Sequence, residues 1–483
     1  MTGTPPARID PTRIETDICI IGGGSGGLSV AAGASQMGAR VVLIEKGEMG
    51  GDCLNYGCVP SKALLAAGHA AEAVRRAGRF GVRATLGGVD GKAVYGHVEG
   101  VIDAIRPMDS QERFEGLGVT VIREHGRFTG PDRVQAGATE IRAKRFVVAT
   151  GSSAAVPPIP GLDGVDFLTN ESVFDRESLP DHLLVIGGGP IGVEMAQAHA
   201  QLGCTVTLLE MFSIMANDDG ELVDVVRRAL TAGGIDIREG IKIASVEKTA
   251  AGVAVTIEQG GETQRVEGSH LLVAAGRRAN VGGLDLEKAG IDYTPKGITV
   301  DARLRSSNKK VFAIGDVAGG LQFTHVAGYH AGVVIKNALF RLPAKADHSA
   351  VPWVTYTAPE LAQVGLTEKK ARDAGIEFNV LRWPFHENDR AQAERETEGL
   401  VKAIVTPKGK ILGCGIAGPH AGEHIHLWGL ALSKGMKVGD LATLIAPYPT
   451  LGEVSKRAAG SFFTPKLFTD RTRAIVRFLL KLG

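Results

Sequence analysis

Short apolar runs of four or five residues, most of them followed by glycines, recur along the chain and alternate with alanine-rich segments of helical period. Runs this short are typical of strands buried on both faces of a parallel sheet, and the segments between them suit crossover helices. Strands are therefore expected at 17–21, 40–44, 183–186, 206–209 and 311–314, and helices at 28–37, 61–79, 91–115 and 193–201. The alternation predicts an α/β protein with two Rossmann-like units.

The first unit carries a phosphate-binding signature. Gly22, Gly24 and Gly27 follow the first strand in G-x-G-x-x-G spacing, and Glu45 ends the second strand. Glycines at this spacing let a pyrophosphate approach the N-terminus of the next helix, while the acid receives ribose hydroxyls. Strand, glycines, helix and acid together predict a dinucleotide site rather than a plain glycine turn.

The second unit repeats the first. Gly187, Gly189 and Gly192 follow strand 183–186, and Glu210 ends the next strand at the same spacing as Glu45. An internal duplication of this kind indicates two dinucleotides in one chain. An acid at position 210, with no Lys or Arg between positions 211 and 221, favours NAD(H) over NADP(H), whose 2′-phosphate would need arginines.

Two of the five cysteines, Cys53 and Cys58, stand close behind the first unit. In a continuous helix their separation is about 7.5 Å along the axis, whereas a disulfide needs Cα atoms roughly 4.4–6.8 Å apart. A bridge therefore requires a bent turn, which the neighbouring glycines permit. Alone, the spacing would indicate two unrelated buried thiols. Beside two nucleotide sites, it predicts a redox pair. Cys19, Cys204 and Cys414 lie singly in apolar runs and are expected to be inert core residues.

Composition excludes several classes of function. The 483 residues carry a net charge of +1 without an extended basic run, so a nucleic-acid partner is not expected. No stretch of about 18 apolar residues occurs, and the first fifteen residues lack the apolar run of a signal peptide. Without a secretory signal, a cysteine pair is more plausibly catalytic than structural, and the expected compartment is the cytoplasm.

The length calls for about three domains. A stiff Pro-Pro-Ile-Pro-Gly run at 157–161 suggests the first boundary. We expect a split first domain at 1–160 and 280–346 and a second nucleotide domain at 161–279. The segment 347–483, where strands alternate with turns, is expected to form an α+β domain.

These motifs resemble those of the flavoprotein pyridine nucleotide–disulfide oxidoreductases, the family of dihydrolipoamide dehydrogenase, glutathione reductase and mercuric reductase. The resemblance covers about 17–463 and includes Gly51-x-Cys53-x4-Cys58-x-Pro-Ser-Lys62, with all motifs in family order. It implies FAD at Gly22, Gly24, Gly27, Glu45, Lys46, Gly51, Thr150, Gly151, Gly315 and Asp316, and NAD(P)H at Gly187, Gly189, Gly192, Glu210 and Gly276.

The resemblance also assigns chemistry. Nicotinamide reduces the flavin, which opens the disulfide through Cys58, and Cys53 is the interchange thiol that attacks substrate. Lys62 and Glu194 match a pair beside the flavin. A homodimer formed through the C-terminal domain is implied.

One position departs from the disulfide reductases of this family. They carry His-Pro-Thr near the C-terminus, with a Glu five residues past the His, and that His is the acid/base donated across the dimer. Here Pro449, Thr450 and Glu453 keep their places, but Tyr448 replaces the His. A phenol with a reference pKa of about 10 is a poor base near neutrality. A Tyr here is similar to mercuric reductase, although the C-terminal Cys-Cys and the N-terminal C-x-x-C of that enzyme are not present.

The first hypothesis is an FAD-dependent reductase of a small thiol-linked or thiol-bound metal substrate, and no resident metal is expected. The second is a dihydrolipoamide-dehydrogenase-like enzyme acting on a lipoyl or other dithiol carrier. A redox-sensing or electron-transfer flavoprotein is the hypothesis from another class.

Three further features are open to two interpretations. His420, His424 and His426 are read as interface residues rather than a metal site or a substitute base, and His325 as either a flavin neighbour or a core residue. The basic and apolar tail 466–483 is expected to pack on its own protein, with peripheral contact to the inner membrane face as the alternative.

Overall fold

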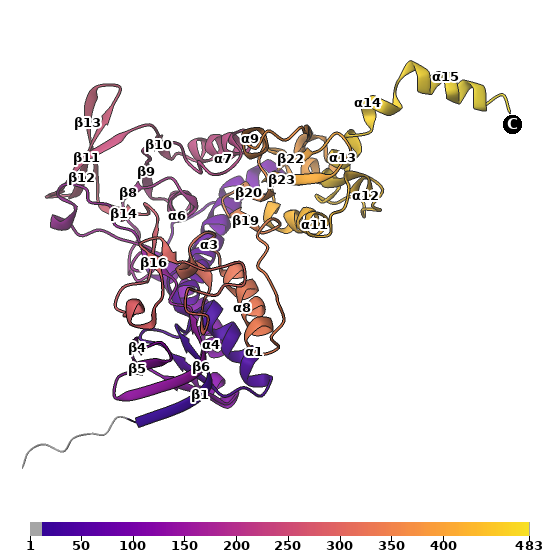
Figure 1. Ribbon diagram of the computed structural model, residues 1–483. Coiled ribbons are helices and arrows are strands. Elements are labelled where there is room, and N and C mark those ends of the chain that lie inside the picture. The colour runs from indigo at the N-terminus through magenta and orange to yellow at the C-terminus, as the bar shows by residue number, and fades with distance from the viewer. Residues whose placement is uncertain (1–11, 483) are drawn as a thin grey trace, which may run out of the picture.

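A computed structural model describes residues 12–482. In Figure 1 the chain forms a lower lobe, an upper nucleotide lobe built from the middle of the sequence, and a C-terminal lobe from which a helical tail projects. The α/β architecture expected from the apolar pattern is confirmed.

The lower lobe is built on a seven-stranded sheet in the order β3-β2-β1-β6-β5-β4, with β18 also paired to β6. Strands β3, β2, β1, β6 and β18 run parallel, and β5 and β4 turn antiparallel at one side. All four side chains of β2 are buried, because helices cover this part of the sheet. Its strands are β1 (Thr12–Ile21), β2 (Val41–Ile44), β3 (Val119–Ile122), β4 (Gly126–Gly130), β5 (Arg133–Ala136), β6 (Thr139–Val148) and β18 (Val311–Ala313).

The helices of this lobe begin and end at residues that the apolar pattern does not reveal. The structure has α1 (Ser25–Gln36), α2 (Gly51–Asn55), α3 (Cys58–Arg76), α4 (Gly91–Asp109), α5 (Gln111–Gly116) and α8 (Thr324–Ala338). The single helix expected at 91–115 is wrong: Ser110 is extended, and its side chain caps α5 by accepting from the Arg113 N–H. Helix α1 starts three residues earlier than expected, inside the glycine loop, because glycines without side chains can enter the first turn.

The upper lobe repeats the parallel arrangement in a four-stranded sheet of order β10-β9-β8-β14, to which a three-stranded antiparallel sheet is added. The elements are β8 (His182–Ile186), α6 (Pro190–Gln201), β9 (Thr205–Leu209), α7 (Gly220–Ala232), β10 (Asp236–Arg238), β14 (His270–Val273), and the hairpins β11 (Lys242–Thr249), β12 (Gly252–Gln259) and β13 (Glu262–Gly268). A two-stranded antiparallel ribbon of β7 (Ser152–Ala154) and β15 (Arg277–Ala279) links the segments that enter and leave this lobe.

The C-terminal lobe is a five-stranded antiparallel sheet of order β19-β20-β23-β22-β21, with its core around the fully buried Trp428. Its elements are β19 (Pro352–Thr355), β20 (Glu360–Gly365), α9 (Glu368–Asp373), β21 (Asn379–Pro384), α10 (Asp389–Glu394), β22 (Leu400–Val405), β23 (Ile411–Gly418), α11 (Ala421–Ser433), α12 (Val438–Ala442) and α13 (Glu453–Ser461). The α+β character expected after residue 347 is confirmed.

A buried ammonium joins the C-terminal and upper lobes. The Lys402 side chain is only 6% exposed, and its Nζ lies 2.8 Å from Asp219, 2.9 Å from Glu221 and 2.8 Å from Glu368. Three carboxylates supply the hydrogen-bond partners that a desolvated ammonium requires. The contact fixes the start of α7 against the C-terminal sheet.

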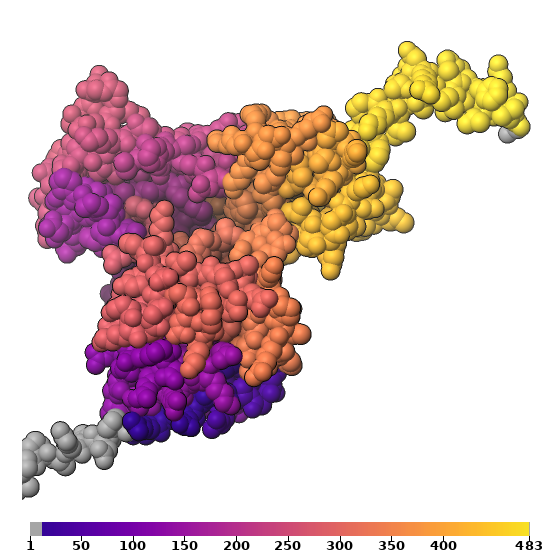
Figure 2. Space-filling model, viewed as in Figure 1, coloured from indigo at the N-terminus to yellow at the C-terminus, as the bar shows by residue number. Residues whose placement is uncertain are grey.

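Two short helices form the tail, α14 (Thr464–Leu467) and α15 (Asp470–Leu479). Neither helix has a buried residue. Figure 2 shows the tail extending clear of the three lobes. Among the described residues, the expected packing of the tail on its own protein is therefore not provided by the lobes of the same subunit.

Candidate active site

Both glycine loops end in helix N-termini that suit phosphate groups. Helix α1 starts after Gly24 and α6 after Gly189; neither has a side-chain cap or an acidic residue in its first turn. A Cβ at Gly27 would lie 1.9 Å from the Gly22 carbonyl oxygen, so only glycine allows this turn to close. The equivalent atom at Gly192 would lie 1.8 Å from the Gly187 oxygen. Unfilled backbone donors at a helix start bind anions, so these residues fit the pyrophosphates of FAD and a nicotinamide nucleotide.

The two acids at the strand ends hold their loops in the same way. Glu45 accepts from the Gly23 N–H at 2.5 Å and the Gly47 N–H at 2.6 Å. Glu210 accepts from the Gly188 N–H at 2.6 Å and the Phe212 N–H at 2.8 Å. Each carboxylate is thereby held beside its glycine loop, where an adenosine ribose is received in this fold.

The dithiol segment packs directly on the first glycine loop. The Gly50 N–H donates to the Gly23 carbonyl at 3.0 Å, and Gly24 and Gly50 form a parallel bridge. A Cβ at Gly51, which has φ +60°, would lie 2.8 Å from the Gly24 Cα. Backbone-to-backbone contact is possible only because both residues lack side chains. The starts of α1 and α2 are therefore adjacent, which places a cysteine helix next to the phosphate site.

The helix breaks between the two cysteines, as their spacing predicts. Cys53 lies in α2, which ends at Tyr56 with φ −138°, and Gly57 is non-helical with φ −127° and ψ −111°. Cys58 then opens α3. A Cβ at Gly57 would lie 2.9 Å from the Asp52 carboxylate, so glycine is required at the bend.

The negative charge of the reduced pair is concentrated on Cys58. A hydrogen bond from Cys53 lowers the pKa of the Cys58 thiol to about 6, helped by Thr324 and the charge of Lys62. The Thr324 Oγ1 lies 3.4 Å from the Cys58 Sγ. The pKa of Cys53 is raised, first because it donates to Cys58 and then because of burial. The pair thus consists of one thiolate and one thiol, two distinct chemical roles.

Lys62 is held over the dithiol by a chain of contacts. Its Nζ lies 2.7 Å from the Glu194 Oε2 and 4.4 Å from the centre of the Tyr356 ring. The Tyr356 N–H donates to the other Glu194 oxygen at 2.8 Å. The structure therefore brings together Cys53, Cys58, Lys62 and Glu194, which come from α2, α3 and α6.

A charged network that the motifs did not reveal surrounds Asp52, the residue before Cys53. The Arg277 guanidinium lies 3.1 Å from the Asp52 Oδ1 and donates to the Ser152 Oγ at 2.7 Å. Ser152 in turn donates to Asp316 at 2.5 Å. Asn170 also donates to Asp52, at 3.0 Å. The only sequence signal was position: Asp52 lies inside the cysteine motif, and Arg277 follows Gly276.

Asp316 occupies the place expected for a flavin-binding acid. It follows β18 at the carboxyl edge of the parallel sheet, in the 3₁₀ turn Gly315–Ala318. Burial raises its pKa, while the Ser152 hydrogen bond and the Arg277 charge oppose this effect. Because Arg277 contacts Asp52 and lies 3.9 Å from Asp316, one guanidinium links the cysteine helix to this acid.

The remaining predicted cofactor residues lie in loops at the strand ends. Thr150 is bonded through its hydroxyl and its carbonyl to Asn280, with distances of 2.8 and 3.0 Å. Gly151 and Gly276 have positive φ angles, as turns at this edge require. Lys46 is exposed, and among the described residues none pairs with its ammonium group.

Tyr448 and Glu453 lie in the C-terminal lobe, away from the dithiol of the same subunit. Tyr448 is 71% exposed and donates through its hydroxyl to Asp389 at 2.8 Å, which raises its pKa. Glu453 pairs with Arg457 at 3.2 Å rather than with Tyr448. Among the described residues no hydrogen bond or ion pair joins either side chain to Cys53 or Cys58. Because its pKa is raised, the Tyr448 phenol is deprotonated even more rarely near neutral pH than a free phenol and is poorly available as a general base.

The histidines noted in the sequence do not gather into one site. Within residues 12–482 no group of three or more His, Cys, Asp and Glu side chains is arranged to hold a metal ion. His426 bonds to the Glu423 carbonyl at 3.1 Å, and burial lowers the pKa of His424. His325 bonds to the Pro352 carbonyl at 2.8 Å and stacks on Phe323.

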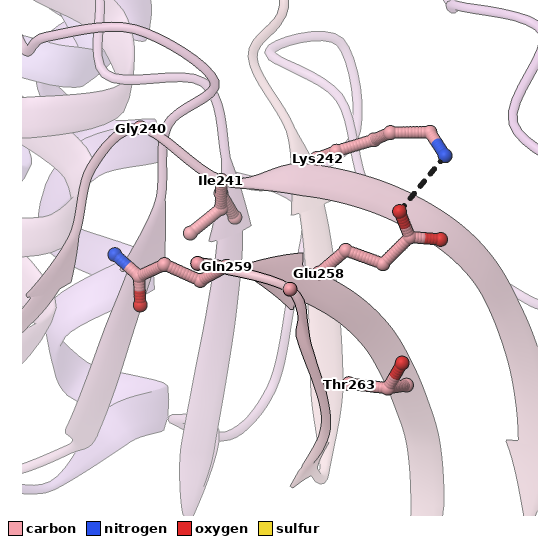
Figure 3. A pocket seen from close by; sticks show the side chains of 8 residues that line it. Gly240, Ile241, Lys242, Glu258, Gln259 and Thr263 are labelled. Atoms are coloured by element: carbon pink, nitrogen blue, oxygen red, sulfur yellow. Dashed lines mark hydrogen bonds and ion pairs between the residues drawn. The ribbon is translucent and has the colours of Figure 1, made fainter.

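A surface hollow on the three-stranded sheet of the upper lobe is less suited than the dithiol to be the reactive site. It is lined by residues around Gly240 and Gly260, and Lys242 pairs with Glu258 across its rim at 3.0 Å (Figure 3). Its lining has glycines, one ion pair and amide or hydroxyl groups, with neither a thiol nor an acid–base pair free to react. The chemistry of this chain is therefore assigned to the dithiol.

Comparison with known proteins agrees with this geometry. Residues 16–331 match the pyridine nucleotide-disulphide oxidoreductase family and residues 351–459 match the dimerisation domain of that family. The chain belongs to the pyridine nucleotide–disulfide oxidoreductases, a family of FAD-binding enzymes, and the dimerisation domain indicates a homodimer.

Similar proteins carry different names. The chain is 35% identical to a mercuric reductase of Bacillus cereus over 94% of this chain and 72% of that protein. It is 38% identical to a dihydrolipoyl dehydrogenase of Thermus scotoductus, over 92% and 96%. The Cu(II) complex of RclA, a HOCl-induced flavoprotein disulfide reductase of Escherichia coli, superposes with a TM-score of 0.82 at 28% identity, covering 91% of this chain and 99% of that one.

Among the described residues, no helix is both long enough and apolar enough to cross a bilayer.

Proposed function

We propose that the protein is an FAD-dependent reductase that passes electrons from NADH through Cys53 and Cys58 to a thiol-bound metal ion. The single observation that carries this choice is Tyr448, whose hydroxyl is bonded to Asp389 at 2.8 Å. Oxidation of a dithiol needs a base that accepts and returns a proton near neutral pH. A metal ion passed between thiolates needs no such base. The Tyr therefore suits metal reduction better than dithiol oxidation.

The names of the similar proteins support the same class of substrate. One relative is a mercuric reductase, and the similar solved structure is a complex with Cu(II). Soft thiolate sulfur suits Hg(II) and the Cu(I) that reduction of Cu(II) produces. Cys58, with a pKa of about 6, supplies one thiolate at neutral pH.

FAD, when bound, accepts hydride from the nicotinamide and supplies the electron pair that opens the disulfide. The protein gives the two cysteine sulfurs different protonation states. Cleavage of the S–S bond takes two electrons and leaves Cys58 as a thiolate and Cys53 as a thiol. After metal binding, re-formation of the S–S bond returns the two electrons. One Hg(II) is reduced to Hg(0), or two Cu(II) to two Cu(I), and the single proton of the Cys53 thiol is released.

The preference for NADH is argued from Glu210. Its carboxylate is held by the Gly188 and Phe212 N–H groups beside the second glycine loop. A 2′-phosphate at this place would meet a fixed negative charge. Two arginines lie near this acid, and both are engaged: Arg227 is bonded to Glu239 and Asp224, and Arg238 to Asp236. We expect kcat/KM to be higher for NADH than for NADPH.

Turnover of the FAD-loaded enzyme under anaerobic conditions tests the substrate class. NADH oxidation is followed with Hg(II) in excess thiol, with Cu(II) in the absence of added thiol, with lipoamide and with glutathione disulfide. Metal-dependent turnover that exceeds both disulfide activities supports the proposal. Cys53→Ser should abolish turnover while NADH still reduces the bound flavin; unchanged turnover in this variant would show that the nucleophile is misassigned.

A second candidate is oxidation of a lipoyl or similar dithiol carrier. The 38% identity to a dihydrolipoyl dehydrogenase over nearly the whole of both chains favours it. Lipoamide turnover above metal turnover in the assay just described would decide for this candidate. A redox-sensing flavoprotein, the third hypothesis, would show rapid reduction by NADH but slow turnover with every acceptor. In each case we propose a cytoplasmic enzyme, because a dithiol that cycles through its reduced state suits a reducing compartment.

A further inference from the structure

Helix α15 leaves a large apolar surface uncovered. The six large apolar side chains between Ile475 and Leu482 are 48–76% exposed. The helix has no buried residue, and its N-terminus is capped in the ordinary way by Thr469, which accepts from the Thr472 N–H at 3.1 Å. A capped, regular helix that exposes so much apolar surface indicates a site of contact with another surface.

Most of the apolar and charged side chains lie on different faces of α15; the exception is Arg471, which stands four positions before Ile475 at the start of the apolar row. Ile475, Val476 and Leu479 stand one and four positions apart, which places them in one stripe along the helix. Arg473 and Arg477 are also four apart and form a row on a separate face. The chain continues this row with Lys481, just beyond the last helical turn.

The charge of the tail is almost purely positive. Five side chains between Thr464 and Leu482 are basic and only Asp470 is acidic. Asp470 already pairs with Arg473 at 3.1 Å. Helices that pack on protein surfaces usually mix both signs, whereas an apolar stripe beside an all-basic row matches anionic lipid headgroups over acyl chains. Charge complementarity therefore favours a lipid surface over a protein partner.

We propose that α15 and the residues that follow it lie on an anionic membrane surface and attach the enzyme peripherally. Ile475, Val476 and Leu479 enter the boundary between headgroups and acyl chains, while Arg473 and Arg477 contact lipid phosphates. The tail extends clear of the lobes, so binding requires no rearrangement of the nucleotide or dithiol sites (Figure 2).

The dimer strengthens this attachment. The tail follows α13 of the C-terminal lobe, which belongs to the dimerisation domain, so a homodimer carries two tails. Once one tail is bound, the second binds at a high effective concentration, and the overall affinity exceeds that of one helix.

The full-length, FAD-loaded dimer is tested by co-sedimentation with vesicles of phosphatidylcholine alone and of phosphatidylcholine with phosphatidylglycerol. We expect binding only to the anionic vesicles, and its loss when residues 466–483 are deleted. R473Q/R477Q should weaken partitioning about 25-fold, since each cation contributes roughly a fivefold effect. The matched variant R473K/R477K keeps both charges and should bind within about twofold of the native enzyme.

The apolar stripe has its own pair of variants. I475S/L479S should weaken binding by about tenfold or more per residue, whereas A474S, on the basic side, should not. Equal binding to neutral and anionic vesicles, or binding insensitive to the deletion, would overturn the proposal. Dissociation of the dimer, or a lower melting temperature, upon deletion would show instead that a second copy covers the tail. Binding is measured without substrate, so these outcomes are independent of the metal-reductase proposal.

Discussion

The low pKa of Cys58 has a specific source that two substitutions at Cys53 can isolate. The largest cause of the lowered value, about 6, is the hydrogen bond that Cys53 donates. Cys53→Ser keeps a donor at this place, while Cys53→Ala removes it. Both variants leave Cys58 without a disulfide partner, so its titration is measured directly.

The size of the effect follows from the strength of a hydrogen bond to a charged group. Such a bond contributes about 1.5–3 kcal/mol, and one pKa unit corresponds to about 1.4 kcal/mol. In Cys53→Ala the pKa of Cys58 should therefore rise by about 1–2, to about 7–8. Thr324 and Lys62 remain, so the pKa should stay below that of a free thiol. In Cys53→Ser it should stay near 6.

The sign of the pH dependence is fixed by the lowered pKa. The reactive thiolate of Cys58 is present above its pKa and is lost as the pH falls through it. Alkylation by iodoacetamide, followed by mass spectrometry between pH 4 and 10, reports this fraction. Cys19, Cys204 and Cys414 are buried and do not interfere. An equal midpoint in the Ser and Ala variants, or a midpoint near 9 in both, would refute the reasoning.

Three other substitutions test separate parts of the structure. Tyr448→His should raise lipoamide turnover about tenfold, less than the 10²–10⁴ of a well-placed base, because Glu453, the acid that the family places beside the His, pairs with Arg457; a fall in turnover would show that the phenol has its own chemical part. Arg277→Met removes the cation that pairs with Asp52, leaving the Asn170 hydrogen bond in place, and should cost about 1–2 kcal/mol of unfolding free energy, discounted because Asp52 is about one-third exposed; adding Asp52→Asn should recover most of it, and a strictly additive pair would contradict the contact. Lys402→Met removes the ammonium shared by three carboxylates, of which Glu221 and Glu368 keep arginine partners, and should cost about 2–4 kcal/mol in urea unfolding, with the exposed Lys369→Met as the neutral control.

Local spacing was enough to predict the glycine loops, the acids that follow them and the broken helix of the dithiol. These features depend on residues close together in the sequence, where the geometry of one turn decides what fits. The start of α1 at Ser25 and the cap at Ser110 were missed because apolar periodicity does not register a helix end.

Contacts between distant segments could not be predicted. Asp52 meets Arg277 across more than two hundred residues, and Tyr448 meets Asp389 within the C-terminal lobe, only because the fold places these distant segments together. The neighbouring sequence does not identify either partner, because an arginine or an acid looks the same in sequence whether it is exposed or paired in a buried contact. The position of the tail could not be predicted for a similar reason: its residues are amphipathic in either interpretation, and only the fold shows that its own subunit does not cover it.

The contact between Gly24 and Gly51 limits how this redox centre could be transplanted. A methyl group on Gly51 would lie 2.8 Å from the Gly24 Cα, so the cysteine segment fits only against a nucleotide loop with glycine at that place. A cassette of residues 51–62 grafted into another flavoprotein would need the phosphate loop of that protein changed as well. The two motifs are one module for protein engineering, and each constrains which mutations the other tolerates.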